Sequence, residues 1–442
     1  MVATPASPAD PATGVTRVVI VGGGFAGVAC AKKLAGEPRV HVTLVDSQGF
    51  HQFLPLLYQI ATAELAPDDV RFDLVKMFGR HGNVDVRAAE VVSVDAHAAS
   101  ARLADGGTVE GDVLVVAAGA QPNFFHTPGA EEFTVPLYGL QDAERVRSRV
   151  LEVFRDAAAK PDLVEDGALN FVIVGAGPTG VETAGALAEL VHDVMPHVYP
   201  HLAIAHARVI LVDLGHTVLN GFSDEAHDYA SKQLRRRGVE LRLGVSVKEV
   251  TDDRVTLSDG TTIKTRLVVW GGGQMASPLA FGSDLPQGRG GRIDVRPDLT
   301  VPGFPGVYAV GDVANIPGAD GNALPQLGSV AQQAGSWAAG NIIADIEGTG
   351  RQPFFYRDKG IMAMIGRKAA VAEIGPHRHE LNGRLAFAAW LGVHAELLGN
   401  ADAEFKAVIA WMEDFYLRPA HRSAELLDPS NINTPRIAST GG

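Results

Sequence analysis

Cysteine is almost missing from this sequence of 442 residues, and its single copy is Cys30. One cysteine excludes an intramolecular disulfide, a cysteine-based zinc cluster and a dithiol redox pair. A chain of this length can bury a large core without such cross-links. We therefore expect no structural metal, and the cysteine usage fits a reducing cytosol.

Positive charge and long apolar runs are also scarce. The chain has 38 Lys and Arg against 51 Asp and Glu, a formal net charge of −13, which argues against a nucleic-acid partner. No stretch reaches 18 uninterrupted apolar residues, so we expect no transmembrane helix. Residues 1–16 are rich in Ala, Pro and Thr and lack a basic or apolar run, which predicts a disordered tail rather than a signal peptide.

Glycine, in contrast, is abundant at 50 residues, and a first cluster follows the β-branched run RVVIV. The cluster reads GGGFAG and leads into a helical pattern and then a strand that ends at Asp46. This spacing is typical of a dinucleotide-binding turn: Gly22 allows the tight turn, Gly24 lets the backbone approach a pyrophosphate, and Gly27 lets helix and strand pack closely. The helix N-terminus attracts the phosphates, and Asp46 can bond the ribose hydroxyls.

The same pattern occurs a second time, after the apolar run LNFVIV. Here the glycines are Gly175, Gly177 and Gly180, and the next strand, RVILVD, ends at Asp213. A single glycine turn is common in proteins, but two copies that each join a strand to a helix and precede a strand ending in Asp predict two dinucleotide sites.

Two further strands end in small residues, DVLVVAAG at Gly119 and GVYAVGD at Gly311 and Asp312. In flavoproteins with two nucleotide domains, strands in this order return the chain to the flavin domain. The aspartate there bonds the ribityl chain and pyrophosphate of FAD. The order therefore predicts FAD in the first site and a nicotinamide cofactor in the second.

These observations predict an α/β fold with two Rossmann-like dinucleotide-binding domains and a C-terminal region with amphipathic helices. The predicted parts are a tail at 1–16, an FAD-binding domain at 17–125 and 296–352, an inserted NAD(H)-binding domain at 126–295, and a C-terminal region at 353–442.

The segment after Asp46, FHQFLPLLYQIATAELAPDDV, has no cysteine where disulfide reductases of this architecture carry a C-x4-C pair. On composition alone it also reads as an ordinary buried loop and helix. However, it resembles the flavin-side loop of the type II NADH:quinone oxidoreductases, which are single-subunit respiratory enzymes that do not pump protons. The resemblance continues through FVIVGAGPTGVETAGALAEL, VVWGGGQMASPLA and PFFYRDKGIMAMIGRKAAVAEI, and covers about residues 17–417.

The resemblance implies FAD and NADH as cofactors, a quinone as acceptor, and roles for individual residues. It places Glu182 near the flavin and nicotinamide, where the carboxyl can relay a proton. The alternative is an acid favoured by the helix dipole. Lys359 would stabilise reduced flavin by its charge, or alternatively pair with Asp358. Gly271, at the end of a strand, would line the nicotinamide site.

The resemblance also implies a quinone pocket. The family's Ala-Gln-x-Ala-x-Gln segment aligns with GSVAQQ, so Ala331 and Gln333 would contact quinone, while Ser329 replaces the first glutamine. Met362 would line the same pocket, although methionine is also a common filler of gaps in a core.

In this family the last two helices dock on the membrane, which implies a peripheral protein on the cytoplasmic side of the cell membrane. The segments 385–398 and 403–417 are apolar on one side, but acidic residues outnumber basic ones there, and an anionic lipid surface would gain little from them. The stripe could instead pack on the protein's own core or in a homodimer, with the protein in the cytoplasm.

The sequence leaves two other functions open. One is a soluble NADH-dependent flavin reductase that acts on a small molecule or a redox protein, which Ser329 and the acidic C-terminal region favour. The other is a redox-sensing flavoprotein in which NADH changes the conformation.

Overall fold

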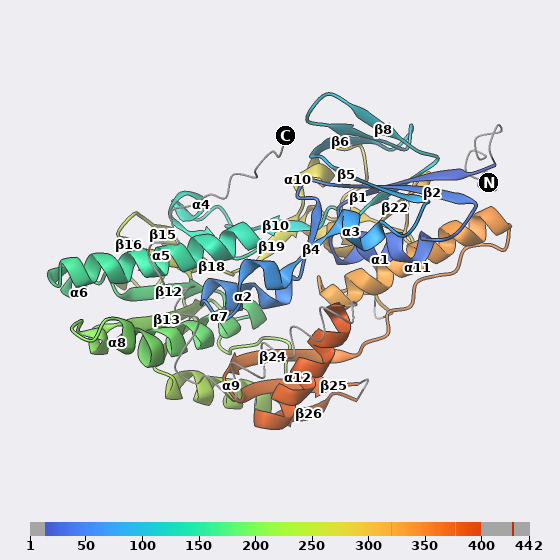
Figure 1. Ribbon diagram of the computed structural model, residues 1–442. Coiled ribbons are helices and arrows are strands. Elements are labelled where there is room, and N and C mark those ends of the chain that lie inside the picture. The colour runs from blue at the N-terminus through green and yellow to red at the C-terminus, as the bar shows by residue number, and fades with distance from the viewer. Residues whose placement is uncertain (1–13, 320, 376, 399–426, 428–442) are drawn as a thin grey trace. The chain divides into compact units, whose positions relative to one another are not determined.

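The computed structural model describes residues 14–319, 321–375, 377–398 and 427 (Figure 1). The chain divides into two compact units. The first is formed by Met1–Gln52, Arg71–Gln121 and Gln274–Asp358, and the second by Phe53–Val70, Pro122–Gly273 and Lys359–Gly442. Compactness does not identify the cofactor that each part binds, so the four-part division by cofactor stays a prediction.

A six-stranded sheet forms the centre of the first unit, with the strand order β21-β22-β9-β1-β2-β5. All neighbours are parallel except β21 and β22. The inner strands β1 and β9 are largely apolar and buried on both faces, as a parallel sheet covered by helices requires, whereas the edge strand β5 is partly exposed. Their bounds are β1 Thr16–Val21, β2 Val40–Asp46, β5 Val84–Ala88, β9 Val113–Val116, β21 Thr300–Val301 and β22 Phe304–Ala309.

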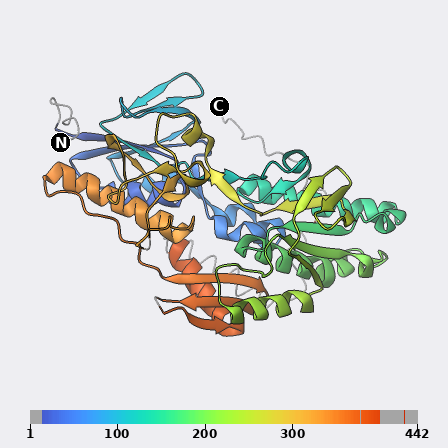
Figure 2. The ribbon, with the colours of Figure 1, turned by 180° about the vertical axis from the view of Figure 1, so that it is seen from behind.

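Two helices lie side by side in this unit, α1 (Phe25–Leu34) and α11 (Gly328–Glu347), as Figures 1 and 2 show from opposite sides. They approach so closely that a Cβ on Gly335 would lie 2.0 Å from the carbonyl oxygen of Ala26. Only glycine fits this contact, which fixes α11 against the helix that follows the first glycine turn.

The second unit contains a five-stranded parallel sheet in the order β11-β18-β12-β13-β14. Both units therefore contain the central parallel sheet of the predicted Rossmann-like fold. In each unit the glycine turn follows the strand at which the strand order reverses, β1 in the first and β12 in the second. The bounds are β11 Val135–Pro136, β12 Asn170–Val174, β13 Arg208–Asp213, β14 Val239–Leu243 and β18 Leu267–Trp270, with helices α5 Leu140–Ala159, α7 Pro178–Glu189 and α9 Asp224–Arg236.

A three-stranded antiparallel sheet of the C-terminal region belongs to the second unit, and helix α12 (Gly383–Leu398) lies against it (Figure 1). Its strands are β24 (Gly360–Gly366), β25 (Ala369–Ile374) and β26 (His379–Asn382). The apolar segment expected at 385–398 is α12, whereas the helix predicted at 403–417 lies outside the described residues.

Shorter elements complete the two units. In the first they are β3 Phe50–Gln52, β4 Arg71–Asp73, α3 Leu74–Phe78, β6 Val91–Asp95, β7 Ser100–Leu103, β8 Thr108–Glu110, α10 Pro278–Phe281, β20 Ile293–Asp294 and β23 Ala314–Asn315. In the second they are α2 Leu57–Ala61, α4 Ala130–Phe133, α6 Asp162–Glu165, α8 Met195–Val198, β15 Val247–Val250, β16 Arg254–Leu257 and β17 Thr262–Lys264. Strands β10 Ala120–Pro122 and β19 Gln274–Ala276 lie at the chain crossings between the units.

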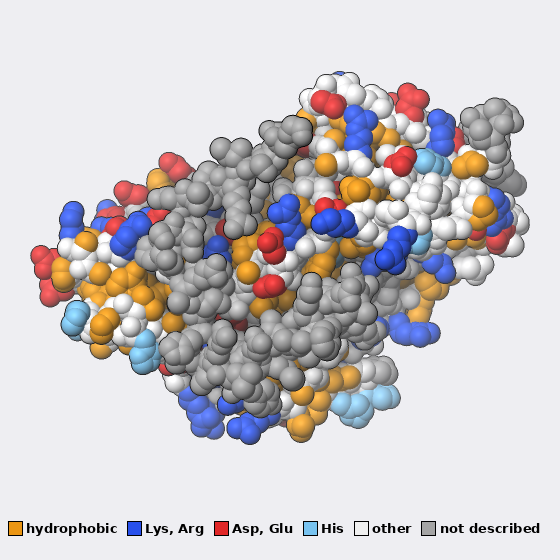
Figure 3. All heavy atoms as spheres, viewed as in Figure 1, with side chains coloured by type: hydrophobic (Ala, Val, Ile, Leu, Met, Phe, Trp, Pro, Cys, Tyr) orange, Lys and Arg blue, Asp and Glu red, His pale blue; other side chains and the backbone are white. Residues whose placement is uncertain are grey.

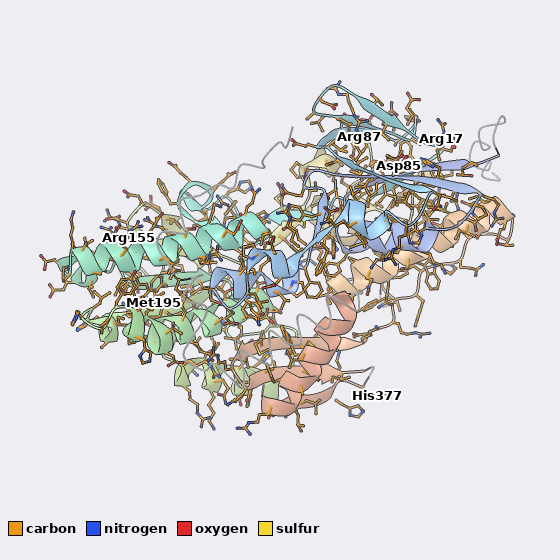
Figure 4. All side chains as sticks on the ribbon, in the orientation of Figure 1. Arg17, Asp85, Arg87, Arg155, Met195 and His377 are labelled. Atoms are coloured by element: carbon orange, nitrogen blue, oxygen red, sulfur yellow. The ribbon has the colours of Figure 1, made fainter. Side chains whose placement is uncertain are left out.

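The surface charges are mixed. On the face shown in Figure 3, Lys and Arg side chains are interspersed with Asp and Glu. Two of the arginines labelled in Figure 4 form exposed ion pairs, Arg17 with Asp112 at 2.8 Å and Arg87 with Asp105 at 3.4 Å. Such exposed pairs contribute about 0–1 kcal/mol each. Among the described residues, no helix combines the length and the hydropathy that crossing a bilayer would need.

Candidate functional site

The first glycine turn, between β1 and α1, has the geometry of a pyrophosphate cradle. Gly22 has φ +105°, and a Cβ there would lie 2.4 Å from the carbonyl oxygen of Ala117. A Cβ on Gly27 would lie 1.8 Å from the carbonyl oxygen of Gly22, whereas a Cβ on Gly24 would meet no atom within 4 Å. The turn is thus tightly packed at Gly22 and Gly27 and open at Gly24, which leaves space at the helix N-terminus for a phosphate.

Asp46, at the end of β2, is fixed against this turn. Its Oδ2 accepts a hydrogen bond from the Gly23 N–H at 2.8 Å, and its Oδ1 accepts one from the Gln48 N–H at 2.8 Å. His51 reaches the same loop, with Nδ1 3.0 Å from the Gly23 carbonyl oxygen. Burial lowers the pKa of His51, so the neutral ring donates this hydrogen bond.

The strand that ends in Gly311 and Asp312 returns to this turn, as the sequence predicts for FAD. Gly311 has φ +74°, and a Cβ there would lie 3.0 Å from the Cβ of Ala26 and 3.5 Å from that of Ala331. Burial raises the pKa of Asp312 to about 6, and the positive charge of Arg292 opposes this rise. Gly119 has φ +69°, and a Cβ there would meet no atom within 4 Å. Together with Gly119, these residues fit a dinucleotide cofactor.

The second glycine turn repeats the first. A Cβ on Gly175 would lie 2.5 Å from the carbonyl oxygen of Gly271, and a Cβ on Gly180 would lie 1.7 Å from that of Gly175. A Cβ on Gly177 would meet no atom within 4 Å. Asp213 accepts hydrogen bonds from the Ala176 N–H at 2.6 Å and the Gly215 N–H at 2.5 Å. The residues again fit a dinucleotide, and the carboxylate is oriented at the end of β13.

Glu182 lies in the second turn of α7 and is buried, with 9% of its surface exposed. Its Oε1 accepts a hydrogen bond from the Met364 N–H of β24 at 3.1 Å. Burial raises the pKa of Glu182 to about 8, although the hydrogen bonds from Met364 and from the Trp390 side chain oppose the rise. At neutral pH the carboxyl is therefore mostly protonated and can donate a proton.

A small cavity of the second unit borders Glu182, with room for about one water molecule. Tyr58 of α2 lines it, and burial raises the pKa of this phenol well above its usual value, with the charges of Glu182 and Glu64 adding to the effect. The remaining lining residues are Gln59, Glu64, Ala186, Glu189, Met364, Gly366 and Arg367.

Helix α11 binds the extended segment 352–357 through residues spaced four apart. Gln333 pairs with the backbone of Arg357 twice, donating to its carbonyl oxygen at 3.1 Å and accepting from its N–H at 3.0 Å. Ser329 Oγ lies 2.9 Å from the Tyr356 hydroxyl oxygen. One and two turns further along, Trp337 and Asn341 each donate to the Gln352 carbonyl oxygen, at 3.0 and 2.9 Å. Gln333 therefore positions this segment, and its predicted contact with quinone stays a prediction.

The other residues predicted for the acceptor side are distributed over both units. Ala331 of α11 is buried against Gly311 in the first unit. Met362 is half-buried on β24 of the second unit, where it pairs with Ala372 of β25. Lys359 directly precedes β24, and its carbonyl oxygen accepts a hydrogen bond from the Gly375 N–H at 3.2 Å. Their roles toward quinone and flavin stay predictions.

Sequence reasoning did not find Trp390, Glu189 or Asn341. Trp390 is fully buried on α12, and its bond to Glu182 joins residues 208 positions apart, which no local pattern reveals. The four-residue spacing of Ser329, Gln333, Trp337 and Asn341 was a usable signal, because it marks one face of a helix.

Comparisons with known proteins agree with this geometry. The pattern of the family described as pyridine nucleotide-disulphide oxidoreductase matches residues 16–335. The chain is 35% identical to the type II NADH:quinone oxidoreductase Ndh of Mycobacterium tuberculosis, over 90% of this chain and 88% of that protein. It is 36% identical to NdhA of the same organism, over 89% of this chain and 86% of that protein.

A solved structure has the same fold. The structure of NDH2 from Plasmodium falciparum in complex with NADH superimposes with a TM-score of 0.84 and covers 91% of this chain and 98% of that chain. At 17% sequence identity, this similarity concerns the fold.

Proposed function

The chain belongs to the type II NADH:quinone oxidoreductases, within the pyridine nucleotide-disulphide oxidoreductase family, and we propose on this basis that it oxidises NADH and reduces a quinone with FAD as cofactor. The observation that carries the proposal is the identity of 35% over 90% of the chain to an enzyme of that name, in a chain whose two glycine turns both keep an open cradle. The electrons pass to quinone without proton pumping.

FAD, when bound, takes up the two electrons of NADH and passes them to the acceptor. The residues of the first unit hold it. Gly22, Gly24 and Gly27 form the turn, Asp46 would bond the ribose, and Asp312 would bond the ribityl and pyrophosphate region of FAD. Gly119 and Gly311 keep side chains out of the cofactor's space.

NADH binds at the second turn, formed by Gly175, Gly177 and Gly180, with Gly271 behind it. Asp213 bonds the adenosine ribose and repels a 2′-phosphate, so the enzyme prefers NADH to NADPH. Its carboxylate is already oriented by the Ala176 and Gly215 N–H groups, which supports this assignment.

Glu182 handles the proton that quinone reduction consumes. Its raised pKa keeps the carboxyl protonated at neutral pH, and a group with a pKa near the working pH can both give and regain a proton. Lys359 offsets negative charge that builds up during electron transfer. Ala331, Gln333 and Met362 are the residues that we propose to contact quinone, and Gln333 also fixes the segment 352–357.

The proposal also includes peripheral attachment to the cytoplasmic face of the membrane through the stripe at 403–417. The alternative is that the stripe packs on the protein's own core or in a homodimer. If the stripe binds lipid, replacing Phe405, Ile409 and Met412 by serine should move the protein from the membrane fraction to the supernatant. Wild type should then resist salt and yield to detergent. A wild-type protein found wholly in the supernatant would contradict membrane attachment, and its mass by light scattering measures the oligomeric state.

The test of the function uses the purified yellow protein. Under anaerobic conditions NADH should bleach the flavin, and a short-chain quinone should restore its colour within a turnover. Ferricyanide serves as the control acceptor, because it reports flavin reduction without a quinone pocket. Rapid reoxidation by ferricyanide but none by any quinone would contradict the proposed acceptor.

A further inference from the structure

A buried ion pair lies two helical turns away from Glu182, at the other end of the same cavity. Glu189, the last residue of α7, is 7% exposed and accepts hydrogen bonds from Arg237 Nε at 2.9 Å and from the Arg367 backbone N–H at 2.7 Å. Arg237 Nη2 in turn donates to the Arg367 carbonyl oxygen at 3.0 Å. Both backbone groups of Arg367, in the turn between β24 and β25, are thus held by one ion pair.

Arg237 has little freedom in this arrangement. It follows the end of α9, and its Nη1 donates to both the carbonyl oxygen and the side-chain oxygen of Gln233 at 3.1 Å. Gly366 makes room for the pair, because a Cβ there would lie 2.2 Å from Arg237 Nε and 2.4 Å from Glu189 Oε1. The guanidinium therefore joins three elements, α7, α9 and the β24–β25 turn.

The same strand contacts α7 at three successive points. The Met364 N–H bonds Glu182, a Cβ added to Gly185 would lie 2.0 Å from the Ile365 carbonyl oxygen, and the N–H of Arg367, in the turn directly after β24, bonds Glu189. From Glu182 to Glu189 a helix rises about 10.5 Å, and the three residues from Met364 to Arg367, which run from the end of β24 into the turn, can span at most about 10–11 Å. The two lengths match, so β24 lies along α7 in a single register that is fixed at both ends.

We propose that the Glu189–Arg237 ion pair is an anchor that keeps β24 in register along α7 and thereby holds the Met364 N–H on Glu182, which makes Glu189 and Arg237 positioning residues for the proton chemistry. The effect on catalysis rests on the proposed role of Glu182. Replacing a buried ion pair by apolar residues of similar size is often neutral for stability, whereas removing one partner is not. The expected effect of the ion pair is therefore on the position of β24 along α7 rather than on overall stability, and the experiment measures that position.

The charged and titratable groups around Glu182 determine whether its pKa should rise or fall in each variant. They are Tyr58 and Glu64 from α2 and the loop after it, Glu189 on α7 itself, Arg237 after α9 and Arg367 in the β24–β25 turn, while the Trp390 side chain of α12 adds a neutral hydrogen bond. Removing the charge of Glu189 alone would relieve repulsion and lower the pKa of Glu182. Losing the Met364 hydrogen bond would raise that pKa, because this bond favours the charged form.

The experiment uses the FAD-loaded double variant Glu189→Leu/Arg237→Met, which leaves the net charge unchanged. Amide hydrogen exchange at Met364 should become at least about tenfold faster, because its N–H bonds Glu182 only while the register holds. The apparent pKa of Glu182, read from the pH profile of quinone reduction, should rise by about half a unit or more. The matched control is Arg235→Met, which removes an exposed charge from the last turn of α9 and should change neither value.

A folded double variant in which Met364 exchanges as slowly as in wild type would overturn the anchor. If the double variant does not bind FAD, Glu189→Gln decides, since it keeps an acceptor and loses the charge. A pKa that falls with unchanged Met364 exchange would then reduce the pair to an electrostatic effect and overturn the proposal, while faster exchange supports it. Should Glu182→Gln leave turnover and pH profile unchanged, the proton role of Glu182 fails, yet the exchange rate still measures the anchor.

Discussion

Replacing Glu182 by Gln should make the protein more stable at neutral pH while it loses activity. The carboxyl is protonated in both the folded and the unfolded state below pH 4.5, so there the folded state bears no penalty. As the pH rises from the ordinary pKa of 4.5 to the folded pKa of about 8, the unfolded chain releases the proton and the folded protein retains it. The raised pKa is therefore a source of stability that is present at low pH and lost as the pH increases.

The magnitude follows from the shift. Each pH unit in this window lowers the free energy of unfolding by about 1.4 kcal/mol, so at pH 7, which is 2.5 units above the ordinary pKa, the loss is about 3 kcal/mol. Gln keeps the size of the side chain and an acceptor oxygen for the Met364 N–H, and it does not titrate. The variant should thus match wild type near pH 4.5 and exceed it by about 3 kcal/mol at pH 7.

Urea unfolding at a series of pH values from 5 to 8.5, at constant FAD concentration, measures this difference. Constant FAD is needed because bound cofactor adds its own stabilisation. Glu249→Gln, which replaces an exposed glutamate of the same unit on β15, is the matched control. Its free energy of unfolding should change with pH in the same way as that of wild type. Parallel curves for wild type and Glu182→Gln would refute the reasoning, because they would mean that Glu182 is ionised in the folded protein. Quinone reduction by the variant should be slower by about tenfold or more if Glu182 relays a proton.

Two further predictions concern cofactor and acceptor binding. Gly177→Ala should raise the KM for NADH and leave the FAD content unchanged, since the added Cβ would meet no protein atom and would occupy the space left for the cofactor at the second turn. Gly180→Ala should instead reduce the yield of folded protein, since its Cβ would lie 1.7 Å from the Gly175 carbonyl oxygen. Equal behaviour of the two variants would contradict a cofactor site at this turn. Gln333→Ala should raise the KM for quinone and speed proteolysis within 352–357, with flavin reduction by NADH unchanged, because it removes both hydrogen bonds to Arg357. If flavin reduction slows as much as quinone reduction, Gln333 acts on the fold and not on the acceptor side.

The cofactor cradles could be predicted from the sequence because their physics is local. Gly22, Gly24 and Gly27 lie within six residues, and each is required by the turn that the same six residues form. The aspartates at the strand ends follow at the distance that one helix and one strand occupy. The parallel order of the sheets then follows from the repeated strand–helix–strand pattern.

The surroundings of Glu182 could not be predicted, because they depend on residues far apart in the chain. Its partner Met364 is 182 positions away, and Arg367 is 178 positions from Glu189. The sequence indicated a functional acid at 182 through resemblance, but its protonation depends on burial by α2, β24 and α12, which the local sequence does not contain. Gln333 was associated with the acceptor through its motif, and the structure adds that its amide is already paired with Arg357.

The strand order of the first unit has a consequence for synthesis on the ribosome. Strand β22, which borders β9 in that sheet, and helix α11, which covers α1, are made after the entire second glycine turn and its sheet. The five strands of the second sheet lie within residues 135–270, so that sheet can form while the first is still open at one edge. The nascent chain therefore exposes the unpaired edge of β9 for about 190 residues of elongation, on the order of 10–40 s at about 5–20 residues per second. The FAD site that we propose includes Gly311 and Asp312, so it cannot be complete until these two residues have left the exit tunnel, and cofactor loading would then be a late event of biosynthesis.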